Sequence, residues 1–380
     1  MNSVNNDSYK NCLIAPNSFK ECSNSIIISK IIYRILHSKL HYNFIQKPIS
    51  DGGDGFIDVC KHYFNGKNIN YTIPNSYNSS KLQCEVLYSK HRKTVYIESA
   101  NVLGLKLVPN EMKNPLYLSS KGLGELLLKL TTEKINIEKV IIGIGGTATI
   151  DMGLGACSVF GLKLFDENNK ELENIPGNFH RIRNIKWQEQ TLSFDITTIL
   201  DVENPLTGIN GAAKVFGRQK GADDSSIRII EKGFNNIVNI LYSKKLIDST
   251  DTLSGAGGGI LAGLGIFLKA KQSSAAEFIL QELEIEDAIK KSDIVITGEG
   301  AFDEQSLMGK GAGIIVNTAK EFQKEIILIC GKIDKNIKSK LGDNTTIIEL
   351  ISFFRDETES IENFELGIRK ACNSIIRMIK

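Results

Sequence analysis

The sequence lacks the cysteine pattern of a disulfide framework or a zinc site. Its seven cysteines are odd in number, and no two of them form a CxxC pair. Disulfide-rich domains usually carry even sets of cysteines, and zinc sites carry closely spaced pairs. The cysteines therefore fit buried thiols in a reducing compartment, and we expect a cytoplasmic protein.

Histidine is scarce where a reaction would need it. The five histidines lie outside every glycine-rich segment of the chain. Chemistry that depends on a histidine base is therefore not favoured.

Long apolar runs and blocks of one charge are also missing. No run approaches the ~20 apolar residues that a membrane helix needs. Residues 1–11 are polar and have no apolar core of a secretory signal. Acidic and basic residues are intermixed, with a formal net charge of +2. We therefore expect neither a membrane nor a nucleic acid as partner, and the oligomeric state stays open.

What is present is the composition of a folded protein. The chain has 380 residues, of which 42% are hydrophobic and 24% charged, and this length favours two domains. Short apolar runs at 12–16 and 44–49 predict strands on either side of a helix that Ser23 or Ser25 would cap.

Two further stretches complete the fold prediction. Residues 69–98 alternate β-like runs with turns, which is typical of an antiparallel meander, whereas 293–350 returns to buried strands separated by helices. We predict an α/β protein of two domains. Residues 1–75 and 290–380 would form a flavodoxin- or Rossmann-like domain with a parallel sheet, and 76–289 would form an inserted mixed α+β domain.

Polar, glycine-rich segments follow several predicted strands, where open α/β sheets bind ligands. Ser18 and Lys20 come between the first strand and its helix, a place that favours anions. The segment 50–55 (SDGGDG) has two carboxylates among three glycines, which suits Mg²⁺ or a substrate hydroxyl group. The alternatives are a turn with a solvated lysine and a helix N-cap.

The segment 143–151 (GIGGTATID) fits the GxGxxA form of a dinucleotide fingerprint, and Asp166 lies near the expected distance for a ribose-binding acid. This match raises a nicotinamide-dependent enzyme as an alternative. Against that interpretation, the segment is central in the chain and not at the start of a Rossmann unit. A glycine-rich loop over phosphate groups agrees with both.

Three later segments have similar features. Asp201 follows an apolar strand and suits a general base or a metal ligand, unless it only ends the strand in an Asx turn. Residues 254–259 (SGAGGG) precede an apolar helix, where backbone amides would bind phosphate or small residues would allow close packing. Asp303 and Lys310 lie in 297–311, which is not a Walker A motif because Glu304 replaces its first glycine.

In this order, the segments resemble the type-1 glycerate kinase family. The matching motifs are IAPNSFK, SDGGDG, IGIGGTAT, DVENPL, GAGGG and TGEG. The resemblance implies a cleft between two domains, with ATP, Mg²⁺ and glycerate as ligands and 2- or 3-phosphoglycerate as product. The chain departs from the family pattern at some of these positions, for example with Ala301 in place of an arginine.

The resemblance and the strand-end positions together give the candidate site residues. The catalytic set is Asp201, Lys310, Asp303 and Lys20, with Asp201 favoured as the base and Asp201 and Asp303 as metal ligands in one cleft. Residues expected to bind the substrate are Ser18, Lys20, Asp51, Gly52, Gly53 and Asp54. Residues expected to bind phosphate or nucleotide are Gly145, Gly146, Thr147, Gly255, Gly257, Gly298 and Gly300. The alternatives are a nicotinamide-dependent hydroxy-acid dehydrogenase and a catalytically inactive relative that binds a hydroxy acid.

Overall fold

The computed structural model describes residues 9–77, 80–200, 204–248 and 250–379. The chain divides into two compact units, which we call unit 1 (Met1–Val59 and Ser274–Lys380) and unit 2 (Cys60–Ser273). Both junctions come earlier in the chain than those expected at 75/76 and 289/290. No helix within the described ranges has the length and apolar character to cross a membrane.

Unit 1 contains a five-stranded sheet in the order β14-β13-β12-β1-β2, in which every pair is parallel. The strands are β1 Asn11–Pro16, β2 Asn43–Gln46, β12 Ile294–Phe302, β13 Glu325–Ile333 and β14 Thr345–Glu349. The central strands are apolar on both faces because helices cover both sides of a parallel sheet. This sheet joins both ends of the chain and confirms the α/β class.

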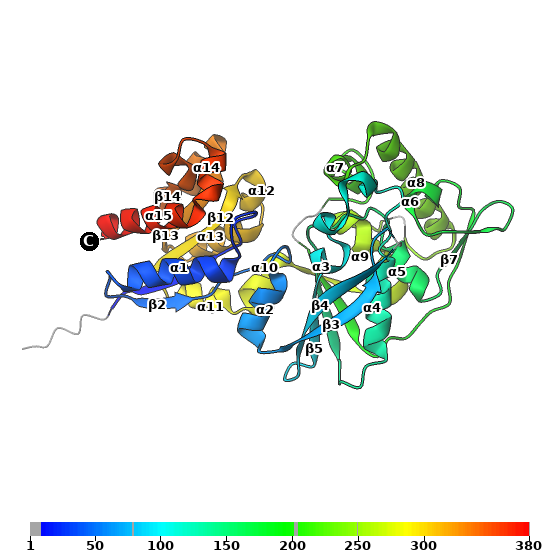
Figure 1. The fold of residues 1–380 in the computed structure, drawn as a ribbon, viewed down its shortest axis with the longest axis horizontal. Coiled ribbons are helices and arrows are strands. Elements are labelled where there is room, and N and C mark those ends of the chain that lie inside the picture. Colours follow the sequence, from blue (N-terminus) through cyan, green and yellow to red (C-terminus); the bar gives the residue numbers. More distant parts are fainter. Residues whose placement is uncertain (1–8, 78–79, 201–203, 249, 380) are drawn as a thin grey trace, which may run out of the picture. The chain divides into compact units, whose positions relative to one another are not determined.

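The helices of unit 1 are amphipathic and cover the faces of this sheet. They are α1 Ser25–His37, α2 Phe56–Phe64 (which runs into unit 2), α10 Ala275–Glu277, α11 Ile285–Lys290, α12 Glu304–Leu307, α13 Gly311–Glu321, α14 Glu357–Glu362 and α15 Phe364–Ile379. Shorter helical turns are Phe278–Glu282, Lys335–Leu341 and Leu350–Phe353. Helices α1 and α15 lie side by side (Figure 1) and share one apolar cluster with the sheet.

The first helix corrects one expectation. Its N-cap is Asn24, whose Oδ1 accepts a hydrogen bond from the backbone N–H of Ile27 at 2.9 Å. The prediction of Ser23 or Ser25 was therefore wrong. Ser25 is already inside the helix and buried, and the amide side chain of Asn24 is placed to reach the third helical residue.

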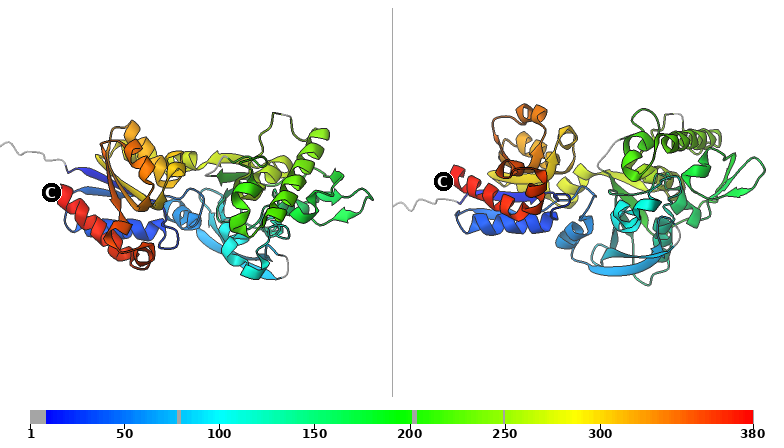
Figure 2. Two further views of the ribbon diagram at one scale, coloured as in Figure 1. Left: turned by 90° about the horizontal axis from the view of Figure 1, so that it is seen from above. Right: turned by 45° about the horizontal axis from the view of Figure 1, so that its top comes forward.

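The side chains of successive residues in the unit 1 strands point to opposite faces of the sheet. Cys12, Ile14, Ile294 and Ile296 belong to the cluster with α1 and α15. Leu13 and the other intervening residues are turned to the opposite face, where α13 packs against β1, β12 and β13 (Figure 2). The sheet is thus covered on both faces.

Unit 2 contains a six-stranded mixed sheet in the order β11-β10-β6-β5-β4-β3. Its strands are β3 Lys67–Pro74, β4 Lys81–Ser89, β5 Thr94–Glu98, β6 Lys139–Gly143, β10 Asp195–Leu200 and β11 Lys271–Ser274. The pairs β3/β4 and β4/β5 are antiparallel, as the meander prediction requires, whereas β5/β6 and β6/β10 are parallel. A small second sheet contains β7 Lys163–Phe165, β8 Glu171–Leu172 and β9 Asn184–Lys186.

Helices bury a single large apolar cluster in unit 2. They are α3 Ala100–Leu103, α4 Lys121–Thr131, α5 Leu154–Val159, α6 Pro176–Phe179, α7 Ala212–Phe216, α8 Asp224–Ser243 and α9 Ala256–Leu268, with 3₁₀ turns at Leu105–Leu107, Asn110–Met112 and Arg218–Lys220. Helix α8 buries Ile230, Phe234 and Ile237 at helical spacing and starts at the cap Asp223. Helix α9 is apolar on all sides because unit 2 surrounds it.

Candidate functional site

The carboxyl ends of β1 and β12 are neighbours in the unit 1 sheet. Pro16 pairs with Gly298, and the N–H of Asn17 donates to the Gly298 carbonyl oxygen at 2.8 Å. The Asn17 amide then donates to Oδ2 of Asp51, in the loop after β2, at 3.0 Å. Three parts of the chain that are distant in sequence therefore meet at one edge of the sheet.

Gly311, the first residue of α13, shows how closely the polar groups approach one another. A Cβ atom on Gly311 would lie 2.4 Å from Oε2 of Glu299, 2.6 Å from Nδ2 of Asn17 and 3.3 Å from Oδ2 of Asp51. Its φ of +44° is also one that other residues rarely adopt. Two carboxylates and an amide thus surround one point that only glycine leaves open.

Glu299 has the unusual environment in this cluster. Its side chain is buried, and burial is the main cause that raises its pKa to about 7, with Asp51 and Asp303 adding negative charge. The Ala312 N–H donates to Oε2 at 3.4 Å. Within the described residues, Oε1 accepts no hydrogen bond of good geometry, although the Ser306 hydroxyl group is near enough to lower the pKa.

Glu299 and Asn17 were not among the predicted site residues. Asn17 is part of the IAPNSFK motif, but its amide is uncharged, and the predicted site residues are mainly charged residues and glycines. Glu299 lies within an apolar strand, between Gly298 and Gly300, and an acid in such a strand is the signal that could have identified it.

Asp303 and Lys310 lie on either side of the short helix α12. Asp303 caps it: Oδ1 accepts from the N–H groups of Gln305 at 2.9 Å and Ser306 at 3.1 Å. Lys310 Nζ donates to Oε1 of Gln305 at 2.7 Å. Lys310 thus contacts α12 at Gln305, two residues after Asp303. A shared site and a catalytic role for either residue stay predictions.

The other predicted residues of unit 1 surround the same strand ends. Lys20 is exposed in a turn closed by the Phe19–Ser23 bridge. A Cβ atom on Gly300 would lie 3.4 Å from the backbone nitrogen of Lys20. The Ser18 N–H donates to Oδ1 of Asn17 at 2.9 Å.

The glycines of unit 1 have conformational or packing roles of their own. The Gly53 N–H donates to Oδ1 of Asp51 at 3.2 Å, and Gly52 has a φ of +97° in the same loop, which continues to the half-buried Asp54. Gly298 lies within β12, where a Cβ would meet the Ile329 carbonyl oxygen at 1.9 Å, so close strand packing alone requires glycine there.

In unit 2, the glycine-rich loop after β6 lies against the segment that leads into α9. The Gly145 N–H donates to Oγ of Ser99 at 3.0 Å, and Gly146 is exposed with a φ of +61°. The Thr147 hydroxyl group donates to the Gly257 carbonyl oxygen at 3.2 Å. These predicted phosphate-binding residues are thus brought together, and Gly255 precedes Gly257 in the same segment.

Asp151 anchors this loop from inside unit 2. Its carboxylate accepts from the N–H and the hydroxyl group of Ser120, both at 2.7 Å, and from the N–H groups of Gly153 and Gly155 at 3.2 Å. Burial raises the pKa of Asp151, and these hydrogen bonds oppose that effect. Its role is to fix the loop and the beginnings of α4 and α5.

Asp201 lies outside the described residues. Its assignment as base and metal ligand, and the cleft that it would share with Asp303, therefore stay predictions.

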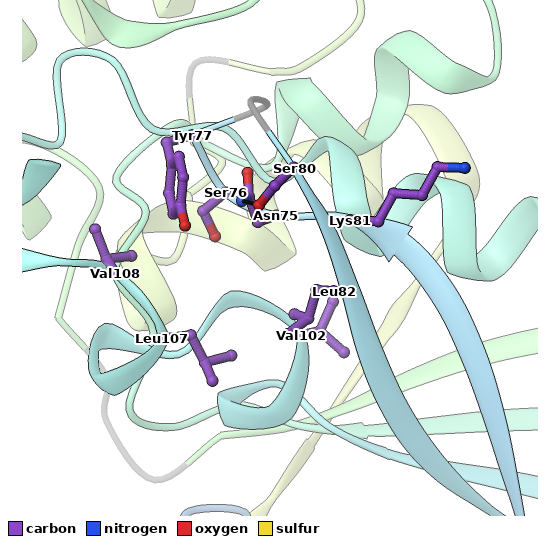
Figure 3. A pocket seen from close by; sticks show the side chains of 9 residues that line it. All are labelled: Asn75, Ser76, Tyr77, Ser80, Lys81, Leu82, Val102, Leu107 and Val108. Atoms are coloured by element: carbon purple, nitrogen blue, oxygen red, sulfur yellow. Dashed lines mark hydrogen bonds between the residues drawn. The ribbon is translucent and has the colours of Figure 1, made fainter.

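Two cavities in unit 2 contain none of the predicted site residues. One, of about 110 Å³, is lined by residues such as Ser76, Leu82 and Val108 (Figure 3), and is smaller than the ~300 Å³ at which ligand pockets usually begin. The other is an open groove of about 1120 Å³ lined in part by Lys67, Lys90 and Arg92. The candidate residues of each unit therefore lie outside both cavities.

A family model described as "Glycerate kinase family" matches residues 12–380. The chain belongs to the glycerate kinase family. A glycerate kinase from Bacillus cereus is 33% identical over 331 residues, covering 85% of this chain and 86% of the relative. The glycerate 2-kinase of Escherichia coli is 32% identical over 332 residues, covering 86% of each.

A solved structure extends the similarity to the fold. A protein of Salmonella typhimurium LT2, assigned as a glycerate kinase 2, superposes with a TM-score of 0.76 at 25% identity, covering 97% of this chain and 98% of that one. The family resemblance of the sequence motifs and the α/β fold class are confirmed. The family assignment does not support the nicotinamide-dependent alternative.

Proposed function

We propose that this protein transfers the terminal phosphoryl group of ATP to D-glycerate. The observation that carries the proposal is the family match, which extends over residues 12–380. The arrangement of carboxylates and glycine-rich loops agrees with phosphoryl transfer, in which positioning and charge neutralisation do most of the work. Because one relative is named a glycerate 2-kinase, we favour the 2-hydroxyl group as the acceptor.

The residues present fit a magnesium ion at the unit 1 strand ends. No group of three or more His, Cys, Asp or Glu side chains in the described ranges forms a metal site on its own. Mg²⁺ bound to nucleotides typically takes only one or two protein carboxylates and completes its shell with phosphate oxygens and water. Asp51 and Glu299 offer this donor set, and the buried, orphaned Oε1 of Glu299 is the observation that supports it.

The bound metal would neutralise charge on the phosphate groups of ATP. The remaining roles fall to side chains of the chain itself. Lys20 and Lys310 would place positive charge near the transferred phosphoryl group. Asp303 is a further candidate ligand, and either Asp201 or Asp303 would accept the proton of the substrate hydroxyl group. The backbone amides of Gly146 and Thr147, in the loop after β6, would bind the phosphates of the nucleotide.

A coupled assay on the purified full chain tests this function. We expect ADP to form only when D-glycerate, ATP and Mg²⁺ are all present, to stop with a chelator and to resume with added Mg²⁺. Enolase converts 2-phosphoglycerate directly, whereas 3-phosphoglycerate needs a mutase first, so the coupling enzyme identifies the hydroxyl group.

Each alternative function has its own result in this assay. Reduction of NAD⁺ by glycerate without ADP formation would establish a dehydrogenase. Binding of glycerate without turnover would establish an inactive relative.

A further inference from the structure

Lys220 is a buried lysine that the proposed roles leave unexplained. It ends the 3₁₀ turn Arg218–Lys220 within unit 2, and its side chain is only 4% exposed. A buried ammonium group is costly unless it is paired. Yet in the described part of the chain no carboxylate lies within ion-pair distance of Lys220.

Its hydrogen bonds go instead to the glycine-rich loop. Nζ donates to the Thr147 hydroxyl oxygen at 3.1 Å and to the Thr149 carbonyl oxygen at 3.0 Å. The Thr147 hydroxyl group in turn donates to the Gly257 carbonyl oxygen at 3.2 Å. One amine thus holds together two segments that contain expected phosphate-binding residues.

The charges of the described residues around Lys220 leave its amine poorly compensated. Burial lowers its pKa to about 7, and Asp151 is the charged group that opposes this. The oxygens of Asp151 are already engaged by Ser120, Gly153 and Gly155. In helix α7, the ring centroid of Phe216 lies 6.0 Å from Nζ, and Lys214 pairs with Glu231.

Among the described residues, two further elements add no compensating charge. The segment 254–259 contains no charged residue. Within the 3₁₀ turn itself, Arg218 is exposed and pairs with Asp224. An anion bound on the loop would therefore be a strong new influence on the protonation of Lys220.

We propose that Lys220 is a positioning residue for the nucleotide: it fixes Thr147 and Gly257, and it takes up a proton from solvent when the phosphates of ATP bind to these segments. The proposal rests on the proposed function, because that function places the nucleotide on this loop. The physical cause is that a nearby anion favours the charged form of an amine, whereas burial alone favours the neutral form.

Calorimetric titration of the full chain with a non-hydrolysable ATP analogue and Mg²⁺ tests this. At pH 8, in buffers of different ionisation enthalpy, we expect uptake of up to about one proton per nucleotide bound. Lys220→Met should abolish the uptake and weaken binding by about tenfold or more. Lys220→Arg should also abolish the uptake, because arginine stays charged, but should bind more tightly than Lys220→Met.

The outcomes separate this inference from the proposed function. Unchanged proton uptake in Lys220→Met would overturn the inference, and so would weaker binding in both variants without any uptake in the wild type. Glycerate-dependent ADP formation with no proton uptake would reject the inference alone. Absence of nucleotide binding together with absence of ADP formation would reject both.

A measurement on the wild type keeps the test open if both variants fail to fold. After correction for the titration of the nucleotide, uptake should decline between pH 8 and pH 6, where the lysine already carries its proton. Constant uptake over this range would contradict the inference.

Discussion

Asp303 illustrates at the residue scale how one side chain can have a structural and a chemical role. Its carboxylate caps α12 and is also a charge beside Glu299. The two roles respond differently to substitution, because asparagine caps a helix about as well as aspartate but carries no charge.

We expect Asp303→Asn to lower kcat by at least about tenfold while leaving the free energy of unfolding nearly unchanged, since only the charge is removed. Asp303→Ala should in addition cost about 1 kcal/mol of stability through loss of the cap. Steady-state kinetics and urea denaturation measure the two effects. The matched control is Asp356→Asn at the cap of α14, which should leave kcat unchanged. If Asp303→Asn keeps full activity, Asp303 is only a cap.

At the scale of elements, the start of α9 depends on an unusual backbone. Gly257, Gly258 and Gly259 have φ values of +61°, +79° and +86°. A Cβ on Gly258 would lie 2.1 Å from the Thr149 carbonyl oxygen and 2.8 Å from the Ile150 Cα atom. These contacts are with backbone atoms, which cannot move aside as a flexible side chain can. The glycines therefore let α9 approach the loop that follows β6.

We expect Gly258→Ala to destabilise the protein by about 2–4 kcal/mol, because left-handed strain and a backbone clash add together. Gly265→Ala in the same helix is the control. Its Cβ would be 3.5 Å from the nearest atom, the Ala270 carbonyl oxygen, and helix propensity should raise stability by about 0.5–1 kcal/mol. Urea denaturation of both variants gives the comparison. Equal free energies of unfolding for the two variants would show that the close backbone approach at Gly258 is not needed for stability.

At the scale of the whole molecule, the two units obtain their cores in different ways. Unit 2 is one continuous stretch with its own apolar cluster. The cluster of unit 1 combines Ile14 and Ile28 from the first segment with Ile327 and Ile368 from the last. Unit 1 therefore needs both ends of the chain.

This difference predicts the behaviour of fragments. Residues 56–273, which keep α2 intact, should fold alone and unfold cooperatively in urea, because their core is complete. Residues 1–55 alone should remain unfolded, since they contribute only part of a core. Circular dichroism and NMR dispersion would show both results. A fragment 56–273 without a cooperative transition would mean that unit 2 depends on unit 1 for stability.

The sequence by itself determined features that arise from local patterns. Apolar runs located β1, β2 and β12, alternation located the meander of β3 to β5, and ordered motifs identified the family. These patterns reflect neighbouring residues along the chain, and periodic burial makes them visible without coordinates.

Only the tertiary structure decided features that depend on distant parts of the chain. Glu299 stands out because Asp51 and Gly311 meet it, and Lys220 stands out because folding places its amine under Thr147. The cap of α1, by contrast, is a local contact, in which Asn24 and not its serine neighbours reaches the backbone. Burial and the pairing of remote segments are properties of the whole fold. The sequence therefore marks Glu299 only as an acid in an apolar strand, and it does not show the contacts that Glu299 and Lys220 make.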